Sequence, residues 1–291
     1  MALIDHIHFA NNADMRQFLP YFWRDRRIGW IHRDRADIVS RWPDAFRKED
    51  DRLILAVEPD TYDGRSNALK EALHGLAEVG EIQGWRGELY PLAPSFGAPA
   101  IAEFERSASP YLGIRAWGVH MTGYVRKPDG LYIWVARRAD DKPTYPGMLD
   151  NTVAGGLPMG LSPHENMVKE CDEEAGIPEN LARNIRPVGI IAYRHQQAEG
   201  LKPDQMFCFD LELPADFQPV NTDGEVGEFM LLPAEEVLEL VRETREFKYN
   251  CNLCLIDFFI RHGIVSSENE PDYIALCLGL TGKESTVGSQ G

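Results

Sequence analysis

The second half of the chain alternates apolar and polar residues in short runs, a pattern typical of β-strands. The runs predict strands over residues 119–125, 131–137, 188–195, 206–213 and 228–232. A Pro128-Asp129-Gly130 turn separates the first two, which favours an antiparallel hairpin. Helical spacing follows over 233–245 and 250–262. This order predicts the α/β class, with helices on both faces of a mixed sheet in an α/β/α sandwich.

The first part of the chain has a different pattern. Apolar residues recur at helical spacing over residues 66–80, a strand is expected at 88–92, and a second helix is expected at 99–108. Pro110 and Gly113 then interrupt the chain. We therefore expect an N-terminal α+β extension over residues 1–112, a second domain over 113–280 and a loose polar tail over 281–291.

Charge narrows the range of partners. The chain has 30 basic and 46 acidic residues, a formal net charge of −16. The part up to Trp117 holds 15 basic and 18 acidic residues, so most of the excess negative charge lies after it. Such a field repels polyanions, which argues against a nucleic-acid partner. A phosphorylated substrate would need metal cations to bridge the repulsion.

The sequence carries no membrane or export signal that we recognise. It has no run of 18 apolar residues and no basic start followed by an apolar stretch, so we expect a cytoplasmic protein without a membrane partner. Five cysteines stand at irregular spacing, and the C-x-x-C pair of Cys251 and Cys254 lacks the companions of a zinc site. We interpret them as reduced thiols.

The segment over residues 153–177, VAGGLPMGLSPHENMVKECDEEAGI, carries the strongest candidate chemistry. Its glycines allow a tight loop that can approach a ligand closely. Ser162 and Glu165 form the S-x-x-E pattern of a capping box, with Pro163 at the first helical position. Gly176 is a typical helix stop. The segment therefore predicts a glycine loop leading into a well-defined helix.

Three glutamates of this helix, Glu170, Glu173 and Glu174, stand at positions i, i+3 and i+4 and share a face. Their like charges repel, and they lie near the helix C-terminus, where the dipole also disfavours anions. An acidic helix face alone is more often solvated surface, but the preceding glycine loop and capping box favour a site. Carboxylates are hard ligands, so we expect Mg²⁺ or Mn²⁺ here.

This stretch resembles the Nudix box, whose pattern is G-x5-E-x7-R-E-U-x-E-E-x-G-U with U a bulky apolar residue. Aligning Gly155 with the first glycine matches Glu170, Glu173, Glu174 and Gly176 to the pattern. The resemblance implies a Nudix-type sandwich and a hydrolase.

Two positions depart from the Nudix pattern. Leu161 replaces the first glutamate and Lys169 replaces the arginine. In the family these two residues mainly support the geometry of the loop and helix, so we interpret their joint replacement as one altered structural contact. We hypothesise that Glu165 pairs with Lys169 instead, at i, i+4.

The resemblance also implies residue roles. Glu170 and Glu174 would be the principal metal ligands, and Glu173 a further ligand or the group that orients the attacking water. The backbone around Ala154 and Gly155 would add an oxygen ligand, and Gly155 and Gly156 would lie against the substrate.

Three further roles depend on later or neighbouring strands. Many family members take a catalytic glutamate from a later loop, for which Glu225 and Glu228 are candidates, although both can equally be turn charges. Arg137 and Arg138 end a strand that runs toward the loop, and a guanidinium suits phosphate oxygens. Because neighbours on a strand point opposite ways, we expect one of them at the site.

The resemblance extends over most of residues 1–265, through segments such as WGVHMTGYV and NLCLIDFFIRHGIV. These look like the Nudix group related to the domain fused to thiamine pyrophosphokinase in some fungi, which implies hydrolysis of thiamine diphosphate or its oxidised analogues to the monophosphate. Five tryptophans could stack on the heteroaromatic ring of such a substrate, although each by itself is more often a core residue. They are Trp23, Trp30, Trp42, Trp85 and Trp117.

Two alternatives remain open from the sequence. The same box would serve a pyrophosphatase acting on nucleoside diphosphate sugars or on dinucleotides, with substrates such as ADP-ribose or NADH. The replaced Leu161 and Lys169 would also suit a binding module without catalysis. A homodimer is expected from the family resemblance alone.

Overall fold

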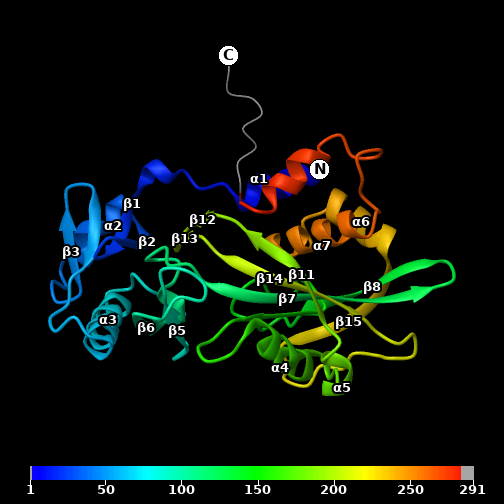
Figure 1. The fold of residues 1–291 in the computed structure, drawn as a ribbon, viewed down its shortest axis with the longest axis horizontal. Helices are drawn as coiled ribbons and strands as arrows, with labels where there is room; N and C mark the ends of the chain where they lie inside the picture. The colour runs from blue at the N-terminus through cyan, green and yellow to red at the C-terminus, as the bar shows by residue number, and fades with distance from the viewer. Residues whose placement is uncertain (1, 283–291) are drawn as a thin grey trace, which may run out of the picture.

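The computed structural model describes residues 2–282, which form two lobes lying side by side (Figure 1). We call residues 14–116 the N-terminal lobe and residues 117–282 the C-terminal lobe. The tail expected over 281–291 falls, after Gly282, outside the described residues.

A seven-stranded mixed sheet forms the centre of the C-terminal lobe. Its main path runs β11-β14-β7-β8-β15, where β14 pairs with β7 in parallel and the other neighbours are antiparallel. The strands are β7 (Trp117–Lys127), β8 (Gly130–Arg138), β9 (Leu149–Asp150), β10 (Val153–Gly156), β11 (Arg186–Ala192), β14 (Gln205–Glu212) and β15 (Val226–Pro233). The predicted strand over 188–195 is interrupted, because β12 (His195–Gln197) pairs separately with β13 (Gly200–Lys202).

The predicted hairpin positions the glycine loop. Strands β7 and β8 pair next to the turn, with Lys127 opposite Gly130. Farther from the turn, β10 pairs with β7 and β9 pairs with β8 in the space between the two strands. The end of β10, which carries Gly155 and Gly156, therefore lies inside the sheet and beside the following helix.

Helices cover both faces of this sheet, which confirms the predicted sandwich. One face packs on α4 through an apolar cluster that includes Met121 and Met167, and the other packs on α6 and α7 through a cluster that includes Tyr124 and Phe258. The helices of this lobe are α4 (Pro163–Ala175), α5 (Glu179–Ala182), α6 (Ala234–Glu243), α7 (Tyr249–Arg261) and α8 (Tyr273–Gly279). Figure 1 shows α4 and α5 on one side and α6 and α7 on the other.

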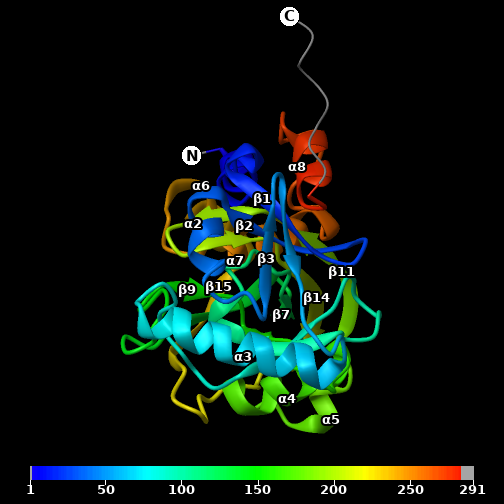
Figure 2. The ribbon, with the colours of Figure 1, turned by 90° about the vertical axis from the view of Figure 1, so that its left-hand side faces the viewer.

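The first helix, α1 (Leu3–Ala10), packs on α7 and α8 although it precedes the N-terminal lobe in the chain. Leu3, Ile7 and Ala10 are buried in the same cluster as the α7 side chains. Figure 2 shows α1 beside α8 at the top of the molecule. The division at residue 112 stays a prediction, and α1 lies with the second of the two expected units.

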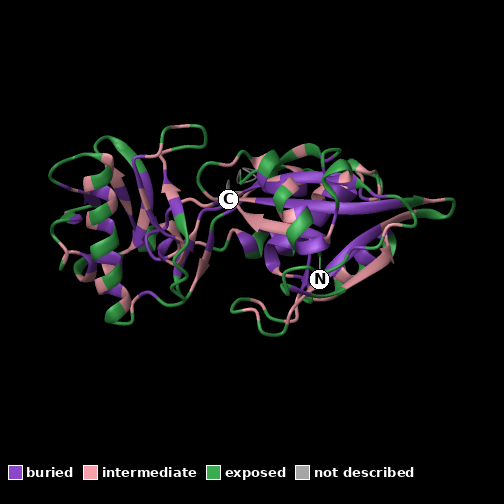
Figure 3. Cartoon of the chain, turned by 90° about the horizontal axis from the view of Figure 1, so that it is seen from below, coloured by how far each residue is buried: buried purple, intermediate pink, exposed green. Residues whose placement is uncertain are grey.

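The N-terminal lobe contains a four-stranded sheet of order β2-β1-β4-β3 with its own apolar core. The amphipathic helix predicted over 66–80 is confirmed and starts earlier, after the N-cap Thr61. Figure 3 shows that this long helix keeps an exposed outer face. The elements are η1 (Met15–Gln17), β1 (Phe18–Trp23), β2 (Arg26–His32), α2 (Arg33–Val39), β3 (Phe46–Glu49), β4 (Arg52–Leu55) and α3 (Tyr62–Glu78).

The helix predicted over 99–108 is wrong. Strand β6 (Ala102–Glu105) pairs there with β5 (Leu89–Leu92), and the short 3-10 helix η2 (Arg106–Ala108) follows. The burial of Ala102 and Phe104 alternates with the partly exposed Glu103, which is the period of a strand. The carboxylate of Glu105 accepts the amides of residues 86, 87 and 107, and this fixes the end of the hairpin.

Polar contacts hold the two lobes together. Arg35 of α2 donates to the carbonyl oxygens of Ala198 and Glu199 at 2.9 and 2.7 Å. The amide of Leu201 donates to the carbonyl oxygen of Pro110 at 2.9 Å. The β12–β13 hairpin of the C-terminal lobe therefore rests against the N-terminal lobe.

The packing of α1 leads to a stability prediction. Ile7 is 5% exposed and lies directly against Gly279 of α8, so Ile7→Ala leaves a cavity. We expect the free energy of unfolding to fall by about 2–4 kcal/mol in urea titrations followed by circular dichroism. Ile274→Ala is the control, because Ile274 is 71% exposed on α8. Equal effects of the two substitutions would contradict the docking of α1.

Candidate functional site

The glycine loop and its helix have the geometry that the sequence predicts. The Ser162 hydroxyl accepts the Glu165 amide at 3.2 Å, and the Glu165 carboxylate accepts the Ser162 amide at 2.9 Å. The helix ends at Gly176, which has a left-handed conformation with φ 58°. The Asn166 side chain donates to the carbonyl oxygen of Gly156 at 2.9 Å. Helix α4 is therefore capped at both ends and attached to the end of β10.

The predicted pairing of Glu165 with Lys169 is wrong. Glu165 is held by the capping box, and Lys169 instead forms an ion pair with Glu173 one turn later. The short reach of Glu165 back to the Ser162 amide explains this, because the cap uses the carboxylate that the lysine would need. Lys169 compensates the helix carboxylates from the solvent side.

The structure brings two of the three helix glutamates against β10. The Glu174 carboxylate accepts the Ala154 amide at 2.9 Å and is 9% exposed. Glu170 lies so close to Gly155 that a Cβ there would be 2.4 Å from the Glu170 Cδ. Only glycine fits at this position without moving the carboxylate. Glu173 is exposed and occupied by Lys169.

The surroundings raise the pKa of both carboxylates. Burial raises the pKa of Glu170, and the charges of Glu173 and Glu225 add to this against the opposing charge of Lys169. Burial also raises the pKa of Glu174 well above its usual value, although the Ala154 amide acts in the opposite direction. A cation between these carboxylates would favour their charged forms. The donor set fits a hard divalent ion, with Glu170 and Glu174 as the residues that would hold it.

The two candidate glutamates of the later loop differ in position. Glu225 lies near enough to raise the pKa of both Glu170 and Glu174, and its own carboxylate pairs with Lys142. Glu228 pairs with Arg137 at 3.7 Å on the adjoining strand. Glu225 therefore acts electrostatically on the helix glutamates, and the choice between Glu225 and Glu228 stays a prediction.

Arg138 belongs to a buried polar network that we did not foresee. Its Nη1 lies 2.9 Å from Asp150 Oδ2, and the Lys248 Nζ lies 3.8 Å from the same oxygen. The Cys251 thiol donates to Asp150 Oδ1 at 2.7 Å. Burial alone would raise the pKa of Asp150, but the neighbouring cations lower it to about 2. The sequence signal for this network is the polar Asp-Asn pair at residues 150–151 between apolar strands.

His120, Asp150 and Cys251 place potential metal-ligating atoms within 4.8 Å of one another. The arrangement fits a metal poorly, because Arg138 and Lys248 already neutralise Asp150 and a dication would lie beside them. Burial, reinforced by Lys248, lowers the pKa of His120 to about 4. We interpret the cluster as a structural ion-pair network.

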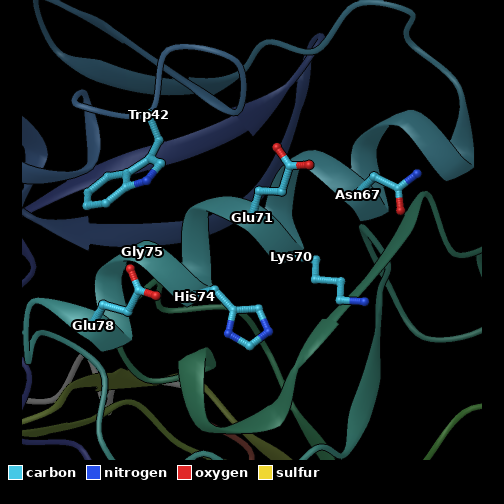
Figure 4. Close-up of a pocket in the computed structure, with 7 residues that line it drawn as sticks. All are labelled: Trp42, Asn67, Lys70, Glu71, His74, Gly75 and Glu78. Carbon is cyan, nitrogen blue, oxygen red and sulfur yellow. The ribbon is translucent and has the colours of Figure 1, made fainter.

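The tryptophans singled out from the sequence do not form one surface. Trp117 is buried and its indole N–H donates to Gln205 at 3.1 Å, which makes it a core residue. Trp42 lines an open hollow of about 500 Å³ on α3, beside His74 and Glu78 (Figure 4). No residue of α4 lines that hollow.

Two residues of the N-terminal lobe reach the glycine loop and were missed by the sequence analysis. A Cβ on Gly156 would lie 1.7 Å from the Tyr90 hydroxyl and 3.5 Å from the Arg106 Cζ. The wrong helix prediction over 99–108 concealed Arg106, because a residue on a free helix gives no indication of contact with the second domain. The loop is therefore lined from both lobes.

The ion-pair network generates the second prediction. Asp150→Asn leaves Lys248 and Arg138 without their buried counter-charge, so the free energy of unfolding should fall by about 3–5 kcal/mol at pH 7. Asp216→Asn, on an exposed loop, is the matched control and should stay within about 0.5 kcal/mol. A small effect of Asp150→Asn in chemical denaturation would contradict the network.

The depressed pKa of His120 gives a pH dependence. Because the pKa of His120 is about 4 in the folded protein and 6.5 ordinarily, the unfolded chain takes up a proton at this group before the folded protein does. The stability that the neutral His120 contributes is therefore fully present above pH 6.5 and is lost as the pH falls toward 4. Relative to His120→Gln, the wild type should lose about 1.4 kcal/mol of stability for each pH unit below 6.5. Unfolding titrations at pH 7.5, 6.0 and 5.0 measure this difference, and parallel pH profiles would exclude it.

No helix within residues 2–282 is long and apolar enough to cross a membrane.

Two family profiles together match most of the chain. Residues 2–116 match a domain of unknown function (DUF4743), and residues 117–251 match the NUDIX domain. In solved structures the chain is similar to the NUDIX domain of Shewanella oneidensis NrtR complexed with ADP ribose, with a TM-score of 0.41 and 12% identity over 52% of this chain and 89% of that one. A C. elegans Ap4A hydrolase has a TM-score of 0.39 and 11% identity over 52% of this chain and 99% of its own. Both TM-scores are below 0.5, so neither likeness bears on the substrate.

Curated relatives are more similar. Nudix hydrolase 24, chloroplastic, of Arabidopsis thaliana is 40% identical over 89% of this chain and 72% of its own length. Nudix hydrolase 20, chloroplastic, of the same plant is 40% identical over 87% and 70%. An uncharacterized protein of Saccharomyces cerevisiae is 32% identical over 80% and 72%. The plant names give no support to a cytoplasmic location, which stays a prediction. Because both plant relatives are 40% identical over more than four fifths of this chain, and the NUDIX profile matches residues 117–251, the chain belongs to the Nudix hydrolase family.

Proposed function

We propose that this hydrolase cleaves the phosphoanhydride of a small organic diphosphate with the help of Mg²⁺ or Mn²⁺. The observation that carries the proposal is the pair of carboxylates held against the β10 glycine loop, the buried Glu174 and the half-buried Glu170. Nudix enzymes generally use divalent metals, and these two side chains are the principal candidate ligands. The Ala154 carbonyl and Glu173 are the further ligands that the resemblance implies.

The metal would neutralise phosphate charge and lower the pKa of a bound water. The protein contributes the remaining steps. The capped helix keeps Glu170 and Glu174 in fixed positions, and the Ala154 amide orients the Glu174 carboxylate. The backbone of Gly155 and Gly156 can approach the diphosphate closely because neither residue has a side chain.

Glu225 is our candidate for accepting the proton of the attacking water. Its charge acts on both Glu170 and Glu174, and a carboxylate beside the metal ligands is the kind of group that can accept this proton. Glu228 is a weaker candidate because it lies on the adjoining strand beside Arg137, and Glu173 is weaker because it lies on the exposed side of α4. Of the two strand-end arginines, Arg137 keeps the phosphate-binding role, since Arg138 is bound within the Asp150 network.

The substrate we propose is thiamine diphosphate or one of its oxidised analogues, cleaved to the monophosphate. Support comes from the resemblance of segments in both lobes to the Nudix group related to thiamine pyrophosphokinase fusions. The negative charge of the C-terminal part further supports a small ligand over a nucleic acid. A homodimer stays a prediction.

Phosphate release at fixed Mg²⁺ tests this proposal. A panel would contain thiamine diphosphate, its oxidised analogues, ADP-ribose and NADH, the last two read with a coupled phosphatase. We expect preference for the thiamine analogues. Glu174→Gln should reduce kcat by more than about 100-fold, since it removes a direct ligand rather than an outer partner. Glu179→Gln, an exposed residue of α5, is the matched control and should retain activity.

The alternative outcomes separate substrate from mechanism. Preference for ADP-ribose or NADH would keep the mechanism and reject the thiamine substrate. Ligand binding without metal-dependent turnover in the folded wild type would reject the hydrolytic proposal itself.

A further inference from the structure

The end of β10 lies between two charged groups from different lobes. On Gly155 a Cβ would collide with the Glu170 carboxylate, and on Gly156 a Cβ would collide with the Tyr90 hydroxyl beneath the Arg106 guanidinium. The closest approaches are 2.4 Å to Glu170 Cδ and 1.7 Å to the Tyr90 hydroxyl. Two adjacent glycines therefore let a carboxylate of the C-terminal lobe and an arginine of the N-terminal lobe approach the same short segment.

Arg106 is held in place while several of its donors remain open. Its Nη1 bonds to Glu88 Oε2 at 2.6 Å, and its Cζ lies 5.3 Å from the centre of the Tyr90 ring. Among the described residues, its Nε and Nη2 form no hydrogen bond. The arginine side chain is 36% exposed. A pre-positioned guanidinium with free donors suits phosphate oxygens.

The hairpin that carries Arg106 is rigid. Glu105 is 3% exposed, and its carboxylate accepts the backbone amides of residues 86, 87 and 107. The Arg106 amide itself donates to the carbonyl oxygen of Glu88 at 2.8 Å. The position of Arg106 is therefore set by the backbone of β5 and β6 and not by a flexible loop.

Charge at the site explains why an arginine matters there. The charge of Glu225 acts on both Glu170 and Glu174, and a diphosphate would add further negative charge. Arg106 and Lys169 are the cations that act on Glu170, and Lys169 is already paired with Glu173 on the solvent side. Arg106 is thus the cation with free donors beside the loop.

We propose that Arg106 and the Tyr90 hydroxyl form a phosphate-binding subsite that the N-terminal lobe supplies to the hydrolase site. The subsite takes the phosphoryl oxygens of the substrate diphosphate, on the side of the loop away from Glu170. It rests on the proposed function, and it makes the N-terminal lobe part of the binding site.

Direct binding tests the subsite without relying on turnover. The probe is methylenediphosphonate, which resists hydrolysis, titrated by calorimetry into the full-length protein with and without Mg²⁺. In Arg106→Met, which keeps an apolar stem on Tyr90 but removes the donors, the Kd should rise about 10- to 100-fold in both conditions. Arg106→Lys should restore only part of the affinity. Arg86→Met is the matched control, because Arg86 is an exposed residue in the segment just before β5.

The kinetic companion is the KM for the best substrate of the panel, which should rise in Arg106→Met in parallel with the Kd of the probe. Circular dichroism and melting temperature identify a variant that fails to fold, in which case Arg106→Gln replaces it. An unchanged Kd in a folded Arg106 variant, with the wild type both binding the probe and hydrolysing substrate, overturns the subsite alone. A wild type that neither binds the probe nor hydrolyses the panel overturns the proposed function and the subsite with it.

Discussion

Two carboxylates of one helix, both held against β10, are the constraint on which the rest of the site depends. Water would stabilise the charges of Glu170 and Glu174, but β10 lies across them and removes much of it. The helix tolerates this because its stability comes from elsewhere, from the capping box at Ser162 and the buried Cys171 on its inner face. Without a cation, the two carboxylates destabilise the fold of the helix. With a cation between them, the same carboxylates become favourable ligands. Helix folding and cation affinity are thus linked.

The glycine loop also couples the two lobes. A side chain on Gly156 would push Tyr90 away, and one on Gly155 would displace Glu170. The two glycines therefore serve packing between lobes as well as approach to a ligand. The hydrogen bonds at the end of the β5–β6 hairpin suit both roles. A loose hairpin could not keep the Tyr90 hydroxyl and the Arg106 guanidinium so close to the loop.

Local patterns predicted the local parts of the structure. Alternation gave the strands around the Pro128-Asp129-Gly130 turn, and the S-x-x-E pattern gave the cap of α4, because both depend on residues close in sequence. The error over 99–108 arose in a short segment, where alternation of Ala102 and Phe104 is too brief to distinguish a strand from a helix. The pairing that decides it comes from β5.

The candidate site was predicted in part for the same reason. Glu170 and Glu174 lie on one helix behind a glycine loop, so their proximity follows from helical geometry. The network of Asp150, Lys248 and His120 joins residues from distant parts of the chain, and no spacing rule connects them. Arg106 was not predicted for two reasons. Its segment was assigned to a helix, and its contact with the glycine loop joins two lobes that are far apart in the sequence.

Helix α1 gives the chain an unusual order of events. It is synthesised before the N-terminal lobe, yet its binding surface is made of α7 and α8, which are synthesised after the central sheet. The N-terminal lobe has its own core, so it can fold before α7 and α8 are made. Until then, Leu3 and Ile7 of α1 have no apolar surface to cover them. Once α7 and α8 cover α1, the N-terminal lobe is joined to the C-terminal lobe on both sides, through α1 before it and through β7 after it.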